Sequence, residues 1–172
     1  MPIYALGEQE PDIHPDAYVH PDAVLIGSVV LGADSSVWPG TVIRADDAPI
    51  VIGDRTSVQD GTVVHTTYMH HTTIGSDVVI GHMAHLEGCT IEDLALVGSG
   101  SVVLHEAIVR TGSIVGANAV VTNGLEVPSG HMALGVPAKL RDAGVDPEMI
   151  RLNAANYVHR GRTYRNSLRR LD

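Results

Sequence analysis

Aliphatic residues return about every six positions over most of the chain, and this repeat restricts the fold more than any other feature of the sequence. An amphipathic helix needs apolar residues three and four positions apart, and a hairpin sheet needs strict alternation interrupted by turns. Neither pattern fits this stretch. The repeating aliphatic positions are Ile26, Leu31, Val37, Ile43, Ile52, Val58, Val64, Ile74, Ile80, Leu86, Ile91, Val97, Val103, Val109, Val115, Val121 and Val127.

Hexads of this kind are typical of a parallel β-helix with a triangular cross-section. Each hexad supplies one short strand and one corner, and three hexads complete a coil that adds about 4.8 Å to the column. The aliphatic side chain points inward and stacks on its equivalents in the coils above and below. Longer steps, from 43 to 52 and from 64 to 74, indicate inserted loops. The sequence therefore predicts an all-β domain built as a solenoid.

The repeat fades after Val127, and the end of the chain has a different character. Asp146 and Pro147 suit the cap and the first position of a helix, and Ile150 and Ala154 begin an apolar face. We therefore expect a β-helix domain over residues 1–140 and a C-terminal α-helix, within residues 141–172, that packs on it.

Composition excludes some classes of partner. The formal net charge is -9 and no cluster of Lys and Arg occurs before residue 160, which argues against binding to nucleic acid or to an anionic membrane. Small molecules are the expected ligands. The single cysteine, Cys89, rules out an intrachain disulfide, and neither a membrane-spanning apolar run nor a leader is evident, so we predict a cytoplasmic protein.

The three-hexad coil aligns polar residues that are far apart in sequence. Counting hexads places Arg44, His65, Glu87 and Leu104 in one outward-pointing column, with His65 and Glu87 in adjacent coils. Asp60 and His82 fall in a second column, on another edge of the triangle. The predicted β-helix thus carries two separate groups of metal-ligating and acid-base side chains.

A triangular prism does not bring two of its own edges to one point, but a second copy can supply the missing edge. In a homotrimer with three-fold symmetry, His82 of one subunit would meet His65 and Glu87 of the next. Two imidazoles and a carboxylate around an open position suit catalytic zinc, which lowers the pKa of bound water. The alternative is a set of solvated surface histidines, since the chain has ten histidines in all.

Three stretches carry a resemblance to a known family. "SVWPGTVIRADDAPIVIGDRTSVQDGTVVHTT", "IGHMAHLEGCTIED" and "ALGVPAKL" resemble the gamma-class carbonic anhydrases, a family of hexapeptide-repeat proteins. The resemblance covers nearly the whole chain. It implies a left-handed β-helix, a homotrimer, and Zn²⁺, or Fe²⁺ or Co²⁺, at each subunit interface. It also implies reversible hydration of CO2 to bicarbonate by metal-bound hydroxide.

The resemblance also assigns roles to individual residues. His65 matches the first metal ligand of the family, and His82 matches the ligand given by the neighbouring subunit. Arg44 and Asp46 match an interfacial ion pair. Gln59 and Asp60 match the pair that orients the bound water or bicarbonate, which completes the catalytic set Arg44, Asp46, Gln59 and Asp60.

One position departs from the family pattern, because the third histidine ligand is replaced by Glu87. Glu87 keeps the position of that histidine in the column, so a metal set of His65, His82 and Glu87 is possible. His85 is the rival third ligand, but it lies two residues earlier on the same strand face. Loss of metal binding is the third alternative.

Two other functions use the same fold. Acyltransferases or thioesterases acting on coenzyme A derivatives share these coils and use histidine as a base. A non-catalytic assembly subunit would explain the changed ligand position. The first insertion, "ADDAP", has no glutamate to act as the proton shuttle attributed to the most active type of gamma-class enzyme, so we expect slow proton transfer.

Overall fold

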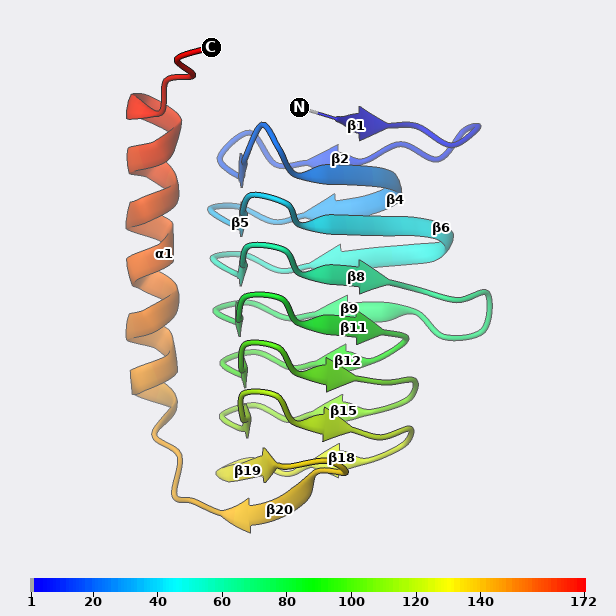
Figure 1. Ribbon diagram of the computed structural model, residues 1–172, viewed down its shortest axis with the longest axis vertical. Helices are drawn as coiled ribbons and strands as arrows, with labels where there is room; N and C mark the ends of the chain where they lie inside the picture. The colour runs from blue at the N-terminus through cyan, green and yellow to red at the C-terminus, as the bar shows by residue number, and fades with distance from the viewer. Residues whose placement is uncertain (1) are drawn as a thin grey trace.

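The computed structural model describes residues 2–172 and consists of a stack of triangular coils with one long helix beside it (Figure 1). All but one of the strand pairings are parallel, the exception being the pairing of the last two strands. The predicted fold class is therefore confirmed: the chain is a left-handed parallel β-helix with a C-terminal α-helix.

The strands stack in three columns, one for each side of the triangle. The first side holds β8 (Val63–His65), β11 (His85–Glu87), β14 (Val102–Val103) and β17 (Val120–Val121). The second holds β2 (Asp12–Ile13), β9 (Thr72–Ile74), β12 (Thr90–Ile91), β15 (Ile108–Val109) and β18 (Glu126–Val127). The third holds β3 (Tyr18–Val19), β5 (Ser36–Val37), β7 (Ser57–Val58), β10 (Val79–Ile80), β13 (Leu96–Val97), β16 (Ile114–Val115), β19 (His131–Leu134) and β20 (Lys139–Asp142).

Two longer strands cover two sides each, and β1 (Ile3–Tyr4) pairs with the first of them. Within β6 (Val42–Ile52), residues 42–44 pair with β8 and residues 50–52 pair with β9. Within β4 (Val24–Leu31), a register shift between Gly27 and Val29 marks the same corner. The insertion that contains Asp46 and Asp47 therefore projects from the corner between two sides, directly beside His65.

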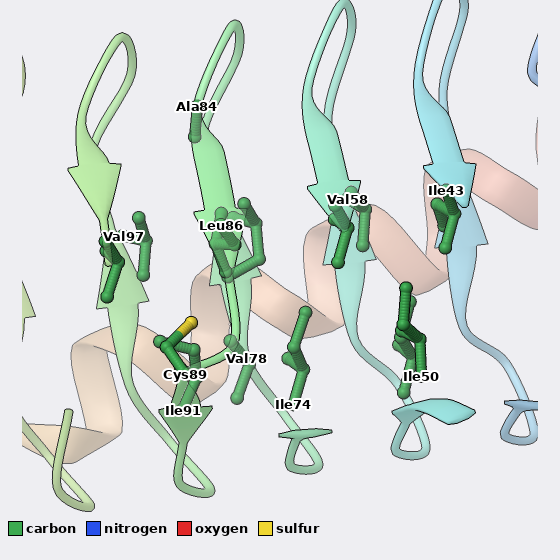
Figure 2. Packing of buried hydrophobic residues seen from close by; sticks show 14 of the residues in the cluster. Ile43, Ile50, Val58, Ile74, Val78, Ala84, Leu86, Cys89, Ile91 and Val97 are labelled. Carbon is green, nitrogen blue, oxygen red and sulfur yellow. The ribbon is translucent and has the colours of Figure 1, made fainter. Parts of the chain in front are cut away.

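The repeating aliphatic residues form the core, as the period predicts. Figure 2 shows inward-pointing side chains stacked from coil to coil, among them Ile43, Val58 and Leu86. Every predicted position is buried except Ile26, where the prediction is wrong: the buried side chain is that of Leu25. The β-strand side-chain period of two explains the error, because a one-residue offset points a side chain to the opposite face.

Glycines at the corners allow adjacent coils to approach closely. A Cβ on Gly81 would lie 2.6 Å from the backbone nitrogen of Ser99, and one on Gly98 would lie 2.5 Å from that of Ala117. Both glycines have ordinary backbone angles, so the requirement is for space. Corner glycines of this kind fix the coil spacing on which the polar columns depend.

Helix α1 (Pro147–Ser167) packs along the third side, against β3, β5, β7 and β10 (Figure 1). It begins at Asp146, whose side chain accepts a hydrogen bond from the backbone N–H of Glu148, and it buries Ile150, Ala154 and Gly161. Strand β20 crosses the expected boundary at residue 140, and the two-domain division stays a prediction. Among the described residues, no helix has the length and apolar character needed to cross a membrane.

Candidate metal centre

His65 and Glu87 are neighbours in adjacent coils, as the column count predicts. The register of β8 and β11 places the two residues opposite each other, with Val64 and Leu86 inside the core. Nδ1 of His65 lies 3.1 Å from Oε1 of Glu87. Both side chains are mostly covered, with 16% of His65 and 24% of Glu87 exposed.

The other ring nitrogen of His65 faces a second carboxylate. Nε2 lies 3.1 Å from Oδ1 of Asp46, which projects from the corner of β6. The guanidinium of Arg44 pairs with the other oxygen of Asp46. Arg44 and His65 are register partners in β6 and β8, so the first polar column is complete.

This arrangement has a direct electrostatic consequence. A neutral imidazole carries one N–H and one lone pair, so it donates to only one of two flanking carboxylates. The lone pair of the other nitrogen then opposes a carboxylate oxygen, which is unfavourable unless a cation lies between them. A metal ion can fill that position. The environment of His65 therefore favours cation binding.

Both carboxylates are held in the charged form. Partial burial opposes ionisation of Glu87, but the surrounding imidazoles of His65, His85 and His105 outweigh burial and lower its pKa. Burial likewise opposes ionisation of Asp46, while its own backbone N–H, His65 and Arg44 together hold its pKa below the usual value. Ionised oxygens are the form that binds a divalent cation.

Buried Thr72 fixes the backbone around the His65 and Glu87 pair. Its hydroxyl donates to the carbonyl of His65 at 2.5 Å and accepts from the backbone N–H of Gly88 at 2.8 Å. Thr72 follows the loop of residues 66–71, which connects β8 and β9. A single side chain thus ties the end of β8 to the end of β11.

The second polar column is also formed. Nδ1 of His82 lies 2.8 Å from Oδ2 of Asp60, and both side chains are about half exposed, at 50% and 48%. A carboxylate that accepts from Nδ1–H leaves the Nε2 lone pair of His82 free for another partner. Gln59 precedes Asp60 and is almost fully buried, with 4% exposed.

Thr62 stabilises the turn that carries His82 through two hydrogen bonds. Its hydroxyl donates to the carbonyl of Gly81 at 2.9 Å and accepts from the backbone N–H of Ala84 at 3.3 Å. His82 therefore has a fixed backbone and a hydrogen-bonded ring, although its side chain is open to solvent.

The two columns stay apart within one chain. Asp60 and His82 belong to the corner after the third side, whereas His65 and Glu87 lie on the first side. In the part of the chain that the structure describes, no hydrogen bond or ion pair joins the two groups. The chain alone thus brings together Arg44, Asp46, His65 and Glu87, and separately Asp60 and His82.

The donors suit a divalent metal. Two ligands on a tetrahedral zinc ion lie about 3.3 Å apart, given bonds of about 2.0–2.2 Å. The gaps of 3.1 Å from His65 to Glu87 and to Asp46 are close to this value. Asp47 adds another donor, because ligand atoms of Asp46, Asp47 and His65 lie within 4.8 Å of one another.

Comparison with known proteins identifies the family of the chain. The chain is 36% identical over 160 residues to "Gamma carbonic anhydrase 2, mitochondrial" of Arabidopsis thaliana, covering 88% of this chain and 58% of that protein. It is 37% identical over 159 residues to "Carnitine operon protein CaiE" of Proteus sp., covering 91% and 81% respectively. Residues 10–45 match the family model "Bacterial transferase hexapeptide (six repeats)". The chain belongs to the gamma carbonic anhydrase-like family of hexapeptide-repeat proteins.

A solved structure of the same family type extends this likeness to three dimensions. The "hexapeptide transferase family protein from Anaplasma phagocytophilum" superposes with a TM-score of 0.91 at 35% identity, covering 95% of this chain and 98% of that one. By contrast, this chain spans 58% of the length of the Arabidopsis protein. This member of the gamma carbonic anhydrase-like family is thus similar both to a named gamma carbonic anhydrase and to a hexapeptide transferase family protein.

Sequence reasoning missed two residues of the candidate site, Asp47 and His105. His105 lies 3.5 Å from Glu87, and its ring stacks on that of His70, with centroids 5.3 Å apart. The column count placed Leu104 beside Glu87. His105 follows immediately, at the turn after β14, and the corner directs it back towards the carboxylate. A search two residues past the end of each strand, the offset at which Asp60 and His82 follow theirs, would have found it.

Proposed function

We propose that this protein is a metal-dependent enzyme of the gamma carbonic anhydrase type, a lyase that catalyses the reversible hydration of CO2. The observation that carries the proposal is the position of His65 between two carboxylates, Glu87 and Asp46, each 3.1 Å from a ring nitrogen. Family membership supports an enzyme, and the donor set supports a metal.

The metal set is His65 and Glu87 of one subunit and His82 of a neighbouring copy. Asp60 accepts from Nδ1 of His82 and leaves Nε2 for a partner outside the chain, and half of the His82 side chain is exposed. A closed homotrimer repeats a single kind of interface three times, so it would form three identical sites of this kind. Arg44 and Asp46 lie beside His65 and would face the incoming subunit.

A divalent ion of the zinc type, whether Zn²⁺, Fe²⁺ or Co²⁺, would supply the Lewis acidity that makes water a nucleophile near neutral pH. The residues of the chain then hold and orient the reactants. Gln59 and Asp60 lie next to His82 in the second column. Their side chains would orient the water or bicarbonate. The single buried cysteine is consistent with the proposed cytoplasmic location.

Stopped-flow measurement of CO2 hydration tests this function. The zinc-loaded wild type should accelerate hydration above the buffer rate, and H65A and H82A should each return to that rate. H14A, in the first coil, is the matched control and should retain the wild-type rate. Equal rates for the wild type, H65A and H82A would reject the proposal.

The second candidate function is acyl transfer or thioester hydrolysis on coenzyme A derivatives. It is favoured by the transferase family model over residues 10–45 and by the likeness to a hexapeptide transferase family protein. Turnover of acetyl-CoA without CO2 hydration would support it. Near-zero metal content after growth in zinc, iron and cobalt would instead favour a non-catalytic assembly subunit.

A further inference from the structure

We propose that His85 and His105 are positioning residues that hold Glu87 in the orientation needed to bind the metal. This role rests on the proposed metal site. It concerns residues outside the three proposed ligands, and it explains how a carboxylate can occupy a place where the family pattern has an imidazole.

Three imidazoles surround Glu87. Oε1 lies 3.1 Å from Nδ1 of His65 and 3.5 Å from Nε2 of His105, and Oε2 lies 3.1 Å from Nε2 of His85. An ionised carboxylate has about four lone-pair sites. If His65 turns its lone pair to a metal, His85 and His105 still hold both oxygens.

His105 is itself held in place. Its Nε2 is buried and, among residues 2–172, has no hydrogen-bond partner beyond the 3.5 Å contact to Glu87. Its ring stacks on His70, which comes from the loop of residues 66–71, with ring planes 24° apart. The space for this stack depends on Gly88, since a Cβ there would lie 2.6 Å from Cβ of His70 and 2.8 Å from Cδ2 of His105.

The physical need for such support follows from side-chain flexibility. Glutamate has one more rotatable bond than histidine, so fixing its side chain costs more conformational entropy. Contacts with His85 and His105 restrict the Glu87 side chain before the metal binds, so less side-chain entropy is lost on binding. Outer-shell partners of metal ligands typically change metal affinity by about 10- to 100-fold.

Titration of the metal-free protein with Co²⁺, followed by its visible absorption spectrum, tests this role. H85L and H105L should each weaken Co²⁺ binding about 10-fold or more and alter the ligand-field bands. H85Q and H105Q place an amide N–H near the position of Nε2 and should restore most of the affinity. H14L is the matched control and should bind like the wild type.

Repeating the substitutions in an E87H variant distinguishes a positioning role of His85 and His105 from a loss of folding. In E87H the third ligand is an imidazole that needs no carboxylate support, so adding H85L or H105L should change Co²⁺ affinity by less than about two-fold. Equal losses in the wild-type and E87H backgrounds, or unchanged affinity in H85L and H105L, would overturn the positioning role alone. A wild-type protein that takes up no Co²⁺ would overturn the proposed metal site as well.

Discussion

Nδ1 of His65 lies 3.1 Å from Oε1 of Glu87, although 22 residues separate them in the sequence. The contact follows from the hexapeptide repeat, which stacks Val64 on Leu86 in the core and so places the next residue of each strand in one outward column. The chemistry of the site is therefore tied to the register of the coils.

Substitution of Glu87 and of Asp47 tests on which side of His65 the metal binds. We expect E87Q to lower zinc affinity about 100-fold or more, because the neutral amide removes a ligand and its charge. D47N should lower it by less than about three-fold, since Asp47 is exposed and lies on the other side of His65. Isothermal titration with Zn²⁺ measures both. A larger loss in D47N than in E87Q would place the metal between His65 and the Asp46 corner.

Subunit mixing tests the shared site. H65A and H82A should each bind almost no metal in pure form. When equal amounts are unfolded and refolded together, about a quarter of the interfaces in a cyclic trimer combine an intact His65 with an intact His82. Metal content after refolding, measured by mass spectrometry, should therefore recover to about a quarter of the wild-type value. No recovery in a correctly assembled mixture would mean that each site is made by one chain.

The Glu92 and Arg110 pair predicts a pH-dependent contribution to stability. The backbone N–H of Thr111 and the side chain of Arg110 lower the pKa of Glu92, and partial burial opposes them less strongly. The ionised form therefore stabilises the folded state above the ordinary glutamate pKa of about 4.3, and this contribution is lost as the pH falls through the lower folded value.

E92Q should consequently cost about 1 kcal/mol at pH 7, and the difference from the wild type should shrink towards zero near pH 3. Urea unfolding at the two pH values measures this, with E106Q as a control at an exposed glutamate. A difference that is the same at both pH values would contradict the assignment.

Val58 and Val51 both lie in β-strands, but only Val58 is buried. Val58 is fully buried between Val37 and Ile80, whereas Val51 points outward with 39% exposed. V58A should lower the free energy of unfolding by about 2 kcal/mol through lost contacts and a residual cavity. V51A should change it by less than about 0.5 kcal/mol. Thermal unfolding of the two variants compares them directly, and equal losses would contradict the inward register.

The period of the aliphatic residues predicts the solenoid, the columns of Arg44, His65 and Glu87, and the pairing of Asp60 with His82. These features depend on strand register alone. His105 and Asp47 were not predicted, because they lie at corners, where the turn geometry sets the direction of the side chain. The prediction for Ile26 was wrong for a different reason: the inward-pointing residue of its strand is Leu25, one position earlier, although Leu31 and Val37 in the same coil are buried as predicted.

A metal-edge anomalous difference map of the assembled protein tests the central claim most directly. The account predicts one peak at each subunit interface, within bonding distance of His65 and Glu87 of one chain and of His82 of its neighbour. A peak bound by residues of a single chain, or the absence of any peak near His65 in protein supplied with zinc, would contradict it.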